Sequence, residues 1–232
     1  MEAELRIVLL VSMLGIAGFF DVRSRKIPDV IWLIFGGIGA ILYAWDHHNV
    51  TSYHVITIFT SVLVAIMMWR WKIAGLADSF AILAMTVILP VHYEFVMMPI
   101  VILVLSFFLV VIFVAMYNIS LNLSDVIRSK KTKIFSKFSE PKYKKAFAFV
   151  TVHRKRGFEK FVIPMENSMS ITPNTKSFAF LSSSSRNKVT RNNQHLLQSN
   201  EIYVQSVPPL ISYMFGVAVF LLLPEIFSML FF

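Results

Sequence analysis

The chain of 232 residues contains no cysteine, and it has only 13 acidic residues against 22 basic ones. Without cysteine it cannot form disulfides, thiolate metal sites or a cysteine nucleophile. The sequence also lacks the H-E-x-x-H pattern of zinc peptidases and the G-x-S-x-G pattern of many serine hydrolases. These absences argue against thiol, zinc and serine hydrolysis of the usual kinds, so hydrolytic chemistry would have to come from other side chains.

Apolar residues dominate what is present. Hydrophobic residues make up 56% of the chain and charged residues 15%, and the mean hydropathy is +0.68. Soluble domains contain about 45–50% apolar and about 25% charged residues, so the composition indicates a membrane protein. Glu2 and Glu4 stand where a signal peptide has its basic region, and no small-residue cleavage site follows the first apolar run. We therefore expect that run to be retained as a span.

Six apolar segments predict six transmembrane helices. They cover residues 5–20, 30–45, 53–69, 79–90, 96–116 and 208–232. Because a helix needs about 17–25 residues to cross the hydrocarbon core, the first, second and fourth segments need flanking residues or a water-filled cavity at one end. The predicted fold class is an all-α polytopic membrane protein, with six transmembrane helices and a small β-containing cytoplasmic insert between helices 5 and 6.

The basic residues fall on one side of this arrangement. Of the 22 Lys and Arg residues, all except Arg6 lie in the connections that follow the first, third and fifth segments. Since basic connections stay in the cytoplasm, we expect a multi-pass protein of the cell membrane with both termini outside and the insert cytoplasmic. The predicted organisation is residues 1–122 with helices 1–5 and both aspartate motifs, residues 123–206 as the basic insert, and residues 207–232 as helix 6.

The insert predicts a small basic module that contains strands. Residues 144–152 alternate as K-K-A-F-A-F-V-T-V, residues 158–165 are again β-like, and residues 201–207 are a further strand candidate. The positive charge favours anionic headgroups, so membrane lipids are expected partners. No motif indicates binding to nucleic acid.

Two small clusters predict local packing. Gly36, Gly37 and Gly39 follow no predicted strand, so they indicate close helix packing and not a phosphate-binding loop. Asn118 and Asn122 are four residues apart at the end of the fifth segment. We expect them either to hydrogen-bond to each other or to fray the helix.

The first connection carries an acidic residue in an unfavourable place. Asp21 follows the first segment, at a helix C-terminus, where the macrodipole disfavours negative charge. A carboxylate at the membrane boundary also needs water or a partner. Arg23 or Arg25 can supply that partner, which would make the role of Asp21 structural. Asp29, after Pro28, suits the N-cap or first turn of the next helix.

Asp78 precedes the fourth segment and by itself suits a helix cap, because the dipole favours a carboxylate at a helix N-terminus. The predicted topology nevertheless brings Asp21 and Asp78 to the same, cytoplasmic membrane boundary. Two close carboxyl groups retain one proton, so one can activate water while the other donates to a carbonyl oxygen. The pair therefore suits aspartic peptide hydrolysis without metal or cofactor. The helix dipoles favour Asp78 as the starting base and Asp21 as the acid.

The residues around both aspartates resemble the type IV prepilin peptidases, and within them the archaeal preflagellin (prearchaellin) peptidases. Residues 21–28, D-V-R-S-R-K-I-P, are similar to the family's D-x-R-x-R-x-I-P segment. Residues 75–78, G-L-A-D, are similar to its G-x-G-D motif, with Ala77 in place of the second glycine. The matching positions besides the aspartates are Arg23, Arg25, Pro28, Gly75 and Ala77.

The resemblance implies a membrane aspartyl endopeptidase with Asp21 and Asp78 as its catalytic residues. The other matching positions would bind substrate or support the two motifs. The partners would be preflagellin or prepilin-like precursors, which lose a short basic leader (a class III signal peptide) at the cytoplasmic membrane boundary. No cofactor or metal is implied. The cysteine-containing methyltransferase segment of the bacterial members is absent, which implies a peptidase without N-methylation activity.

Two other functions stay open at this point. Carboxylates inside a membrane also serve as proton or cation sites, so the alternative is an ion- or proton-coupled transporter. The internal repeats common in carriers are not evident in this sequence. The remaining possibility is a non-enzymatic membrane scaffold whose basic insert recruits a partner.

Overall fold

A computed structural model describes residues 2–45, 52–71, 75–92, 95–129, 135, 138, 141–155, 162–164, 166–167, 177–178 and 202–222. This part of the chain is mostly helical and packs as two units. We call Met1–Val110 together with Pro209–Phe232 the helical unit, and Val111–Pro208 the insert unit. Helix α5 begins in the first and ends in the second.

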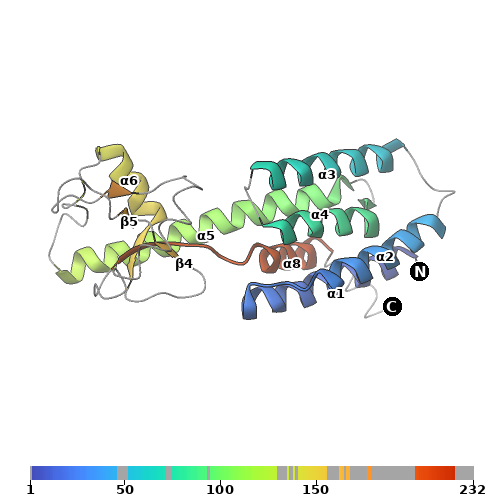
Figure 1. Ribbon diagram of the computed structural model, residues 1–232, viewed down its shortest axis with the longest axis horizontal. Coiled ribbons are helices and arrows are strands. Elements are labelled where there is room, and N and C mark those ends of the chain that lie inside the picture. The colour runs from blue at the N-terminus through green and yellow to red at the C-terminus, as the bar shows by residue number, and fades with distance from the viewer. Residues whose placement is uncertain are drawn as a thin grey trace. The chain divides into compact units, whose positions relative to one another are not determined.

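Apolar helices make up most of the helical unit (Figure 1). Their bounds are α1 Glu2–Ser24, α2 Asp29–Trp45, α3 Ser52–Trp71, α4 Leu76–Ile88, α5 Met98–Ser129 and α8 Leu210–Leu221. A two-residue hairpin, β1 Val91–His92 with β2 Phe95–Val96, precedes α5. Asp29 begins α2, which confirms its predicted place in the first turn.

Three of these helices are long and apolar enough to cross a membrane. The candidate spans in the described chain are Ala3–Ser24, Ser52–Trp71 and Met98–Arg128, whereas α2, α4 and α8 are apolar but shorter. The structure therefore indicates membrane association, and the arrangement of six spans stays a prediction. Residues 223–232, which belong to the predicted sixth segment, lie outside the described residues.

Helix α4 packs against α2 and α3, and it approaches α2 closely at Gly39. A Cβ atom placed on Gly39 would lie 2.7 Å from Cγ1 and 3.2 Å from Cα of Ile88. One turn earlier, a Cβ on Gly36 would lie 3.9 Å from Cβ of Ala84, whereas one on Gly37 would meet nothing within 4 Å. The prediction of close helix packing is thus confirmed at Gly39.

Arg6, the basic residue outside the three basic connections, is buried and 8% exposed. Its Nη1 donates to the carbonyl oxygen of Ile88 at 3.0 Å, and its Nη2 donates to that of Leu42 at 3.1 Å. Both acceptors lie in the last turn of a helix, where carbonyls lack helical partners and the macrodipole favours a cation. Arg6 therefore ties the ends of α2 and α4 to α1.

The insert unit contains one further helix and short strands. Their bounds are α6 Lys142–Thr151, β3 His153–Lys155, β4 Val162–Pro164, β5 Glu166–Asn167, β6 Ser177–Phe178 and β7 Ile202–Ser206. Strand β7 lies between β3 and β4 and is antiparallel to both, and β5 pairs with β6. The strand predicted at residues 201–207 is confirmed by β7. The one predicted at 158–165 is described only at 162–164, where it is β4.

The strand predicted at residues 144–152 is wrong, because this stretch lies mostly in α6. Its alternation of large and small residues also fits a helical repeat. Ala148 and Val152, four residues apart, are buried, while Tyr143 and Phe147, also four apart, are exposed. The buried pair packs with Phe135, Phe138 and Tyr203 in the core of the insert unit. This core lies on one side of α6 and determines which side chains point outward.

Asn118 and Asn122 neither fray α5, which continues to Ser129, nor serve mainly to bind each other. Asn118 Nδ2 donates to the carbonyl oxygen of Val150 at 3.0 Å. Asn122 Nδ2 donates to those of Phe149 at 2.8 Å and Val152 at 2.7 Å. Both amides thus supply donors to the carbonyls at the C-terminal end of α6, which have no partners within their own helix.

The contact at Gly39 leads to a stability prediction. Gly39→Ala should destabilise the protein by about 1–3 kcal/mol, because the new Cβ meets backbone as well as side-chain atoms of Ile88 and the two helices must separate. The measurement is thermal unfolding of the purified protein in detergent. Gly37→Ala is the matched control. It should be neutral or stabilise by up to about 1 kcal/mol through helix propensity, and equal behaviour of the two variants would contradict the assigned packing.

Candidate active site

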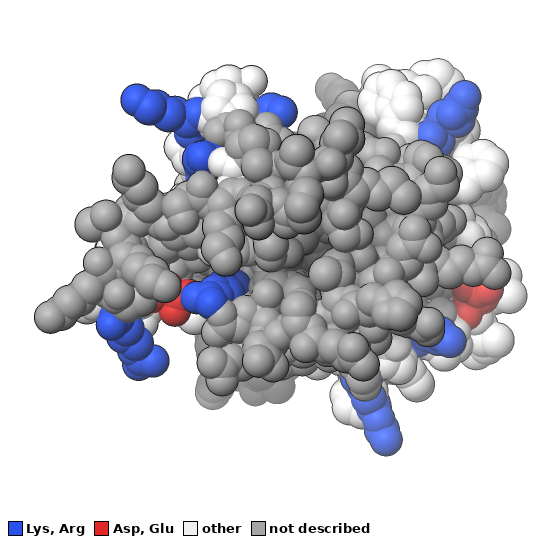
Figure 2. Space-filling model, turned by 60° about the vertical axis from the view of Figure 1, so that its left-hand side comes forward, with Lys and Arg blue, Asp and Glu red and all other residues white. Residues whose placement is uncertain are grey.

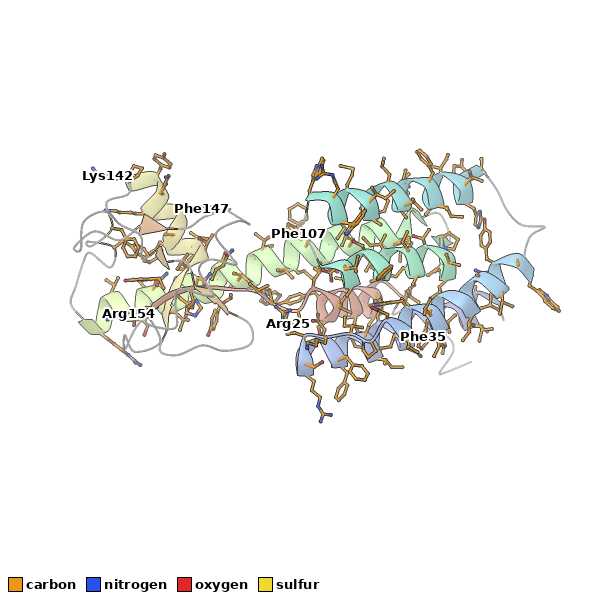
Figure 3. The ribbon with its side chains drawn as sticks, viewed as in Figure 1. Arg25, Phe35, Phe107, Lys142, Phe147 and Arg154 are labelled. Atoms are coloured by element: carbon orange, nitrogen blue, oxygen red, sulfur yellow. The ribbon has the colours of Figure 1, made fainter. Side chains whose placement is uncertain are left out.

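Asp21 lies in the last turn of α1 and is 8% exposed. Its Oδ1 is 3.5 Å from Nη1 of Arg25, four residues later. Arg25 has a left-handed backbone with φ 58°, and its N–H donates to the carbonyl oxygen of Asp21 at 3.1 Å. This turn reverses the chain after α1 and returns the guanidinium to the carboxylate. Figure 3 shows Arg25 in the helical unit, near the end of α1 and the start of α8.

The first turn of α8 packs against the end of α1. A Cβ on Gly18 would lie 3.4 Å from Oγ and 3.5 Å from Cα of Ser212, and Ser212 Oγ donates to the carbonyl oxygen of Gly18 at 3.3 Å. The backbone N–H of Ile211 donates to the carboxyl group of Asp21. First-turn N–H groups have no helical acceptor, and the macrodipole is positive there. The start of α8 therefore offsets the unfavourable position of Asp21 at the end of α1.

Asp78 lies in the first turn of α4 and stabilises its N-terminus, but the cap residue is Gly75 and not Asp78, because the helix begins before the predicted segment. Its Oδ2 accepts a hydrogen bond of 2.7 Å from the backbone N–H of Gly75, the residue that caps the helix. A Cβ on Gly75 would lie 3.2 Å from the same Oδ2. Gly75 has φ −70°, which any residue adopts, so the contact with the carboxylate is what favours glycine here.

The structure brings the two aspartates, from α1 and α4, into one electrostatic environment. The charges of Asp21 and Arg25 both act on Asp78, and Arg25 also acts on Asp21. Asp78 is half-buried. The site thus contains two carboxyl groups, together with one guanidinium and two backbone N–H donors that stabilise their negative charge.

The remaining predicted residues lie in different places. The Arg23 guanidinium lies 5.8 Å from the centre of the Phe19 ring, and Arg25 forms an ion pair with Asp21. Pro28 is exposed, and its carbonyl oxygen accepts a hydrogen bond from the N–H of Ile31 at 3.1 Å, at the start of α2. Ala77 lies within α4 and packs against the apolar core. Since its position is helical, alanine fits there as well as glycine.

Two buried polar groups near this region were not predicted from the sequence. Trp32 and Ser79 are 6% and 4% exposed, and Trp32 Nε1 and Ser79 Oγ have no hydrogen-bond partner among the described residues. Ser79 follows Asp78 directly, which is the signal that could have drawn attention to it. Nothing in the sequence distinguishes Trp32 from an apolar packing residue.

Comparison of the chain with protein-family models, with characterised proteins and with solved structures finds no match.

The left-handed backbone of Arg25 leads to a second prediction. Arg25→Gln and Arg25→Gly both remove the ion pair with Asp21, but only glycine also relieves the left-handed conformation, which costs about 1 kcal/mol for other residues. Arg25→Gly should therefore be more stable than Arg25→Gln by about 1 kcal/mol, measured by thermal unfolding in detergent.

The matched control is Arg23, which lies inside α1. At this position the order should reverse, because glycine costs about 0.5–1 kcal/mol in a helix interior. If the glycine variant were the more stable of the two at both positions, or the less stable at both, the left-handed conformation assigned to Arg25 would be wrong.

Proposed function

We propose that this chain is a membrane aspartyl endopeptidase that cleaves preflagellin or prepilin-like precursors, removing a short basic leader at the cytoplasmic membrane boundary. The observation that carries the proposal is that Asp21 and Asp78 come from two helices that contact each other, α1 and α4, and that the charge of Asp21 acts on Asp78. Both aspartates lie in the segments that resemble the motifs of type IV prepilin peptidases. This resemblance supports a peptidase over other uses of a buried carboxyl pair.

The proposed reaction uses the pair as a unit with one proton. The ionised carboxylate removes a proton from water as the water oxygen attacks the scissile carbonyl carbon, and the protonated partner donates its proton to the carbonyl oxygen. The carboxyl group that took the proton from water then gives it to the leaving nitrogen, the other carboxylate takes back a hydroxyl proton from the tetrahedral intermediate, and the C–N bond breaks. Because both carboxyl groups have backbone N–H donors, we assign the proton to the pair and not to one aspartate.

The proposal includes the six-span topology. The three candidate spans and the three shorter apolar helices would all lie in the cell membrane, with the ends of α1 and the start of α4 at its cytoplasmic face. The insert would be cytoplasmic and both termini outside, as the basic connections favour. A substrate's junction between basic leader and apolar helix would then meet the carboxyl pair.

The test is cleavage of a synthetic precursor peptide, with a basic leader followed by an apolar helix, by the purified protein in detergent. Asp21→Asn and Asp78→Asn should each lower the cleavage rate by roughly 10²–10⁴-fold or more, because neither an acid nor a base can be replaced by an amide. Asp29→Asn is the matched control. Asp29 is exposed at the start of α2, and its amide variant should cleave at the rate of the unaltered protein.

Two outcomes would contradict the proposal. Folded Asp21→Asn or Asp78→Asn protein that still cleaves would exclude the aspartyl mechanism. No cleavage by the unaltered protein, together with solute movement in sealed vesicles that depends on the same two aspartates, would favour the ion- or proton-coupled transporter.

A further inference from the structure

Helix α6 exposes two aromatic side chains on the surface of the insert unit. Tyr143 is 71% exposed and Phe147 is 56% exposed, and their spacing of four residues places them on the same face of the helix. Ala146, between them, is also exposed. Among the described residues, the apolar core of the insert unit contacts α6 through Ala148 and Val152, which lie on another side of the helix. Neighbouring exposed aromatics of this kind mark an interaction surface.

The charges of α6 have one sign. Lys142, Lys144 and Lys145 lie within its first turn and a half, and the helix contains no acidic residue. Figure 3 shows Lys142 and Phe147 both projecting from this helix, and Figure 2 shows Lys and Arg side chains projecting from several parts of the face it displays. Aromatic rings beside lysines are the composition of helices that lie in the interface of an anionic bilayer.

A membrane-spanning α5 would place the end of α6 near the membrane boundary. The candidate span Met98–Arg128 has 31 residues, about 46 Å of helix at 1.5 Å per residue, whereas the hydrocarbon core is about 30 Å thick. Counted from Met98, about 20 residues cross the core, so the helix leaves it near Tyr117. Asn118 and Asn122 come next, and these two residues hold the C-terminal end of α6 through its carbonyls.

We propose that the face of α6 formed by Lys142, Tyr143, Ala146 and Phe147, which we call the α6 outer face, docks on the anionic lipid surface of the membrane that α5 crosses. The rings of Tyr143 and Phe147 lie among the lipid headgroups, as aromatic residues do at membrane interfaces. Lys142, on this face, pairs with an anionic headgroup, and Lys144 and Lys145 add positive charge beside it. This docking does not depend on the proposed peptidase activity.

The absence of cysteine permits a direct test on the full chain. Ala146→Cys adds a single thiol on the α6 outer face and leaves both aromatic residues intact, so an environment-sensitive fluorophore reports on this face alone. The labelled protein is reconstituted in vesicles of phosphatidylcholine, and in vesicles with equal parts of phosphatidylcholine and phosphatidylglycerol. We expect a blue shift of the emission, and quenching by a lipid-attached quencher, only where phosphatidylglycerol is present, and loss of both in high salt.

Matched variants show whether the emission shift comes from the lysines of α6 or from the rest of the insert. Replacing Lys142, Lys144 and Lys145 together by Gln should abolish the shift, and replacing all three by Arg should retain it. A label at Arg154→Cys, an exposed position on β3, should show the same emission in both kinds of vesicle.

Three results would overturn the proposal. The first is the same emission of the Ala146→Cys label in both lipid mixtures. The second is an equal shift of the label at Arg154→Cys, because the response would then not belong to α6. The third is a label that ignores phosphatidylglycerol but shifts with polyglutamate, which would make the α6 outer face a site for an acidic polypeptide.

Discussion

A carboxylate buried at the end of α1 needs compensating positive charge, and the helical unit supplies it from two other parts of the chain. Arg25 returns to Asp21 through a left-handed turn, and the first turn of α8 presents the N–H of Ile211. Helix α8 packs on α1 at Gly18, where Ser212 Oγ donates to the carbonyl oxygen of Gly18. The position of α8 against α1 and the polar site at their junction therefore depend on one another.

A buried positive charge is compensated in the same way elsewhere in the helical unit. Arg6 is buried, and its guanidinium donates to carbonyls in the last turns of α2 and α4, where the macrodipole is negative. The buried aspartate meets the N-terminus of α8, and Asp78 lies at the N-terminus of α4. Helix ends thus provide most of the counter-charge for the buried ionic groups. Such compensation matters in a protein with few charged residues and an apolar surrounding, because an uncompensated buried charge is costly.

The sequence predicts those features that depend on neighbouring residues. Asp29 in the first turn of α2 and Asp78 beside Gly75 follow from local helix chemistry. The apolar runs correspond to helices, but the length of α5 was underestimated because its last turns, from Asn118 onward, are more polar and belong to the insert unit. The predictions failed or stayed incomplete where the contacts of a residue lie far away in the sequence.

Helix α6 and the Ile211 contact illustrate this limit. The alternation in residues 144–152 fits a strand as well as a helix, and the choice is made by the apolar core and by the two asparagines of α5 that bind its carbonyls. The donor to Asp21 is a backbone group, which no side-chain pattern reveals. The dipole of α1 disfavours an ionised Asp21, but the dipole of α8, whose first turn contacts Asp21, opposes this effect.

The net charge of +9 creates a difficulty for a peptidase that acts on basic leaders, since the substrate and the insert repel each other. Anionic lipid removes this repulsion if its headgroups neutralise both the lysines of the insert and the basic leader. Lysines of α6 that pair with headgroups no longer present their charge to the leader, and the same headgroups attract the leader to the membrane surface. Repulsion beyond the Debye length, about 8 Å at physiological ionic strength, is screened in any case. Under the proposed function, the basic insert would orient the protein on the lipid surface, and the specificity for a basic leader would arise from the groups at the carboxyl pair.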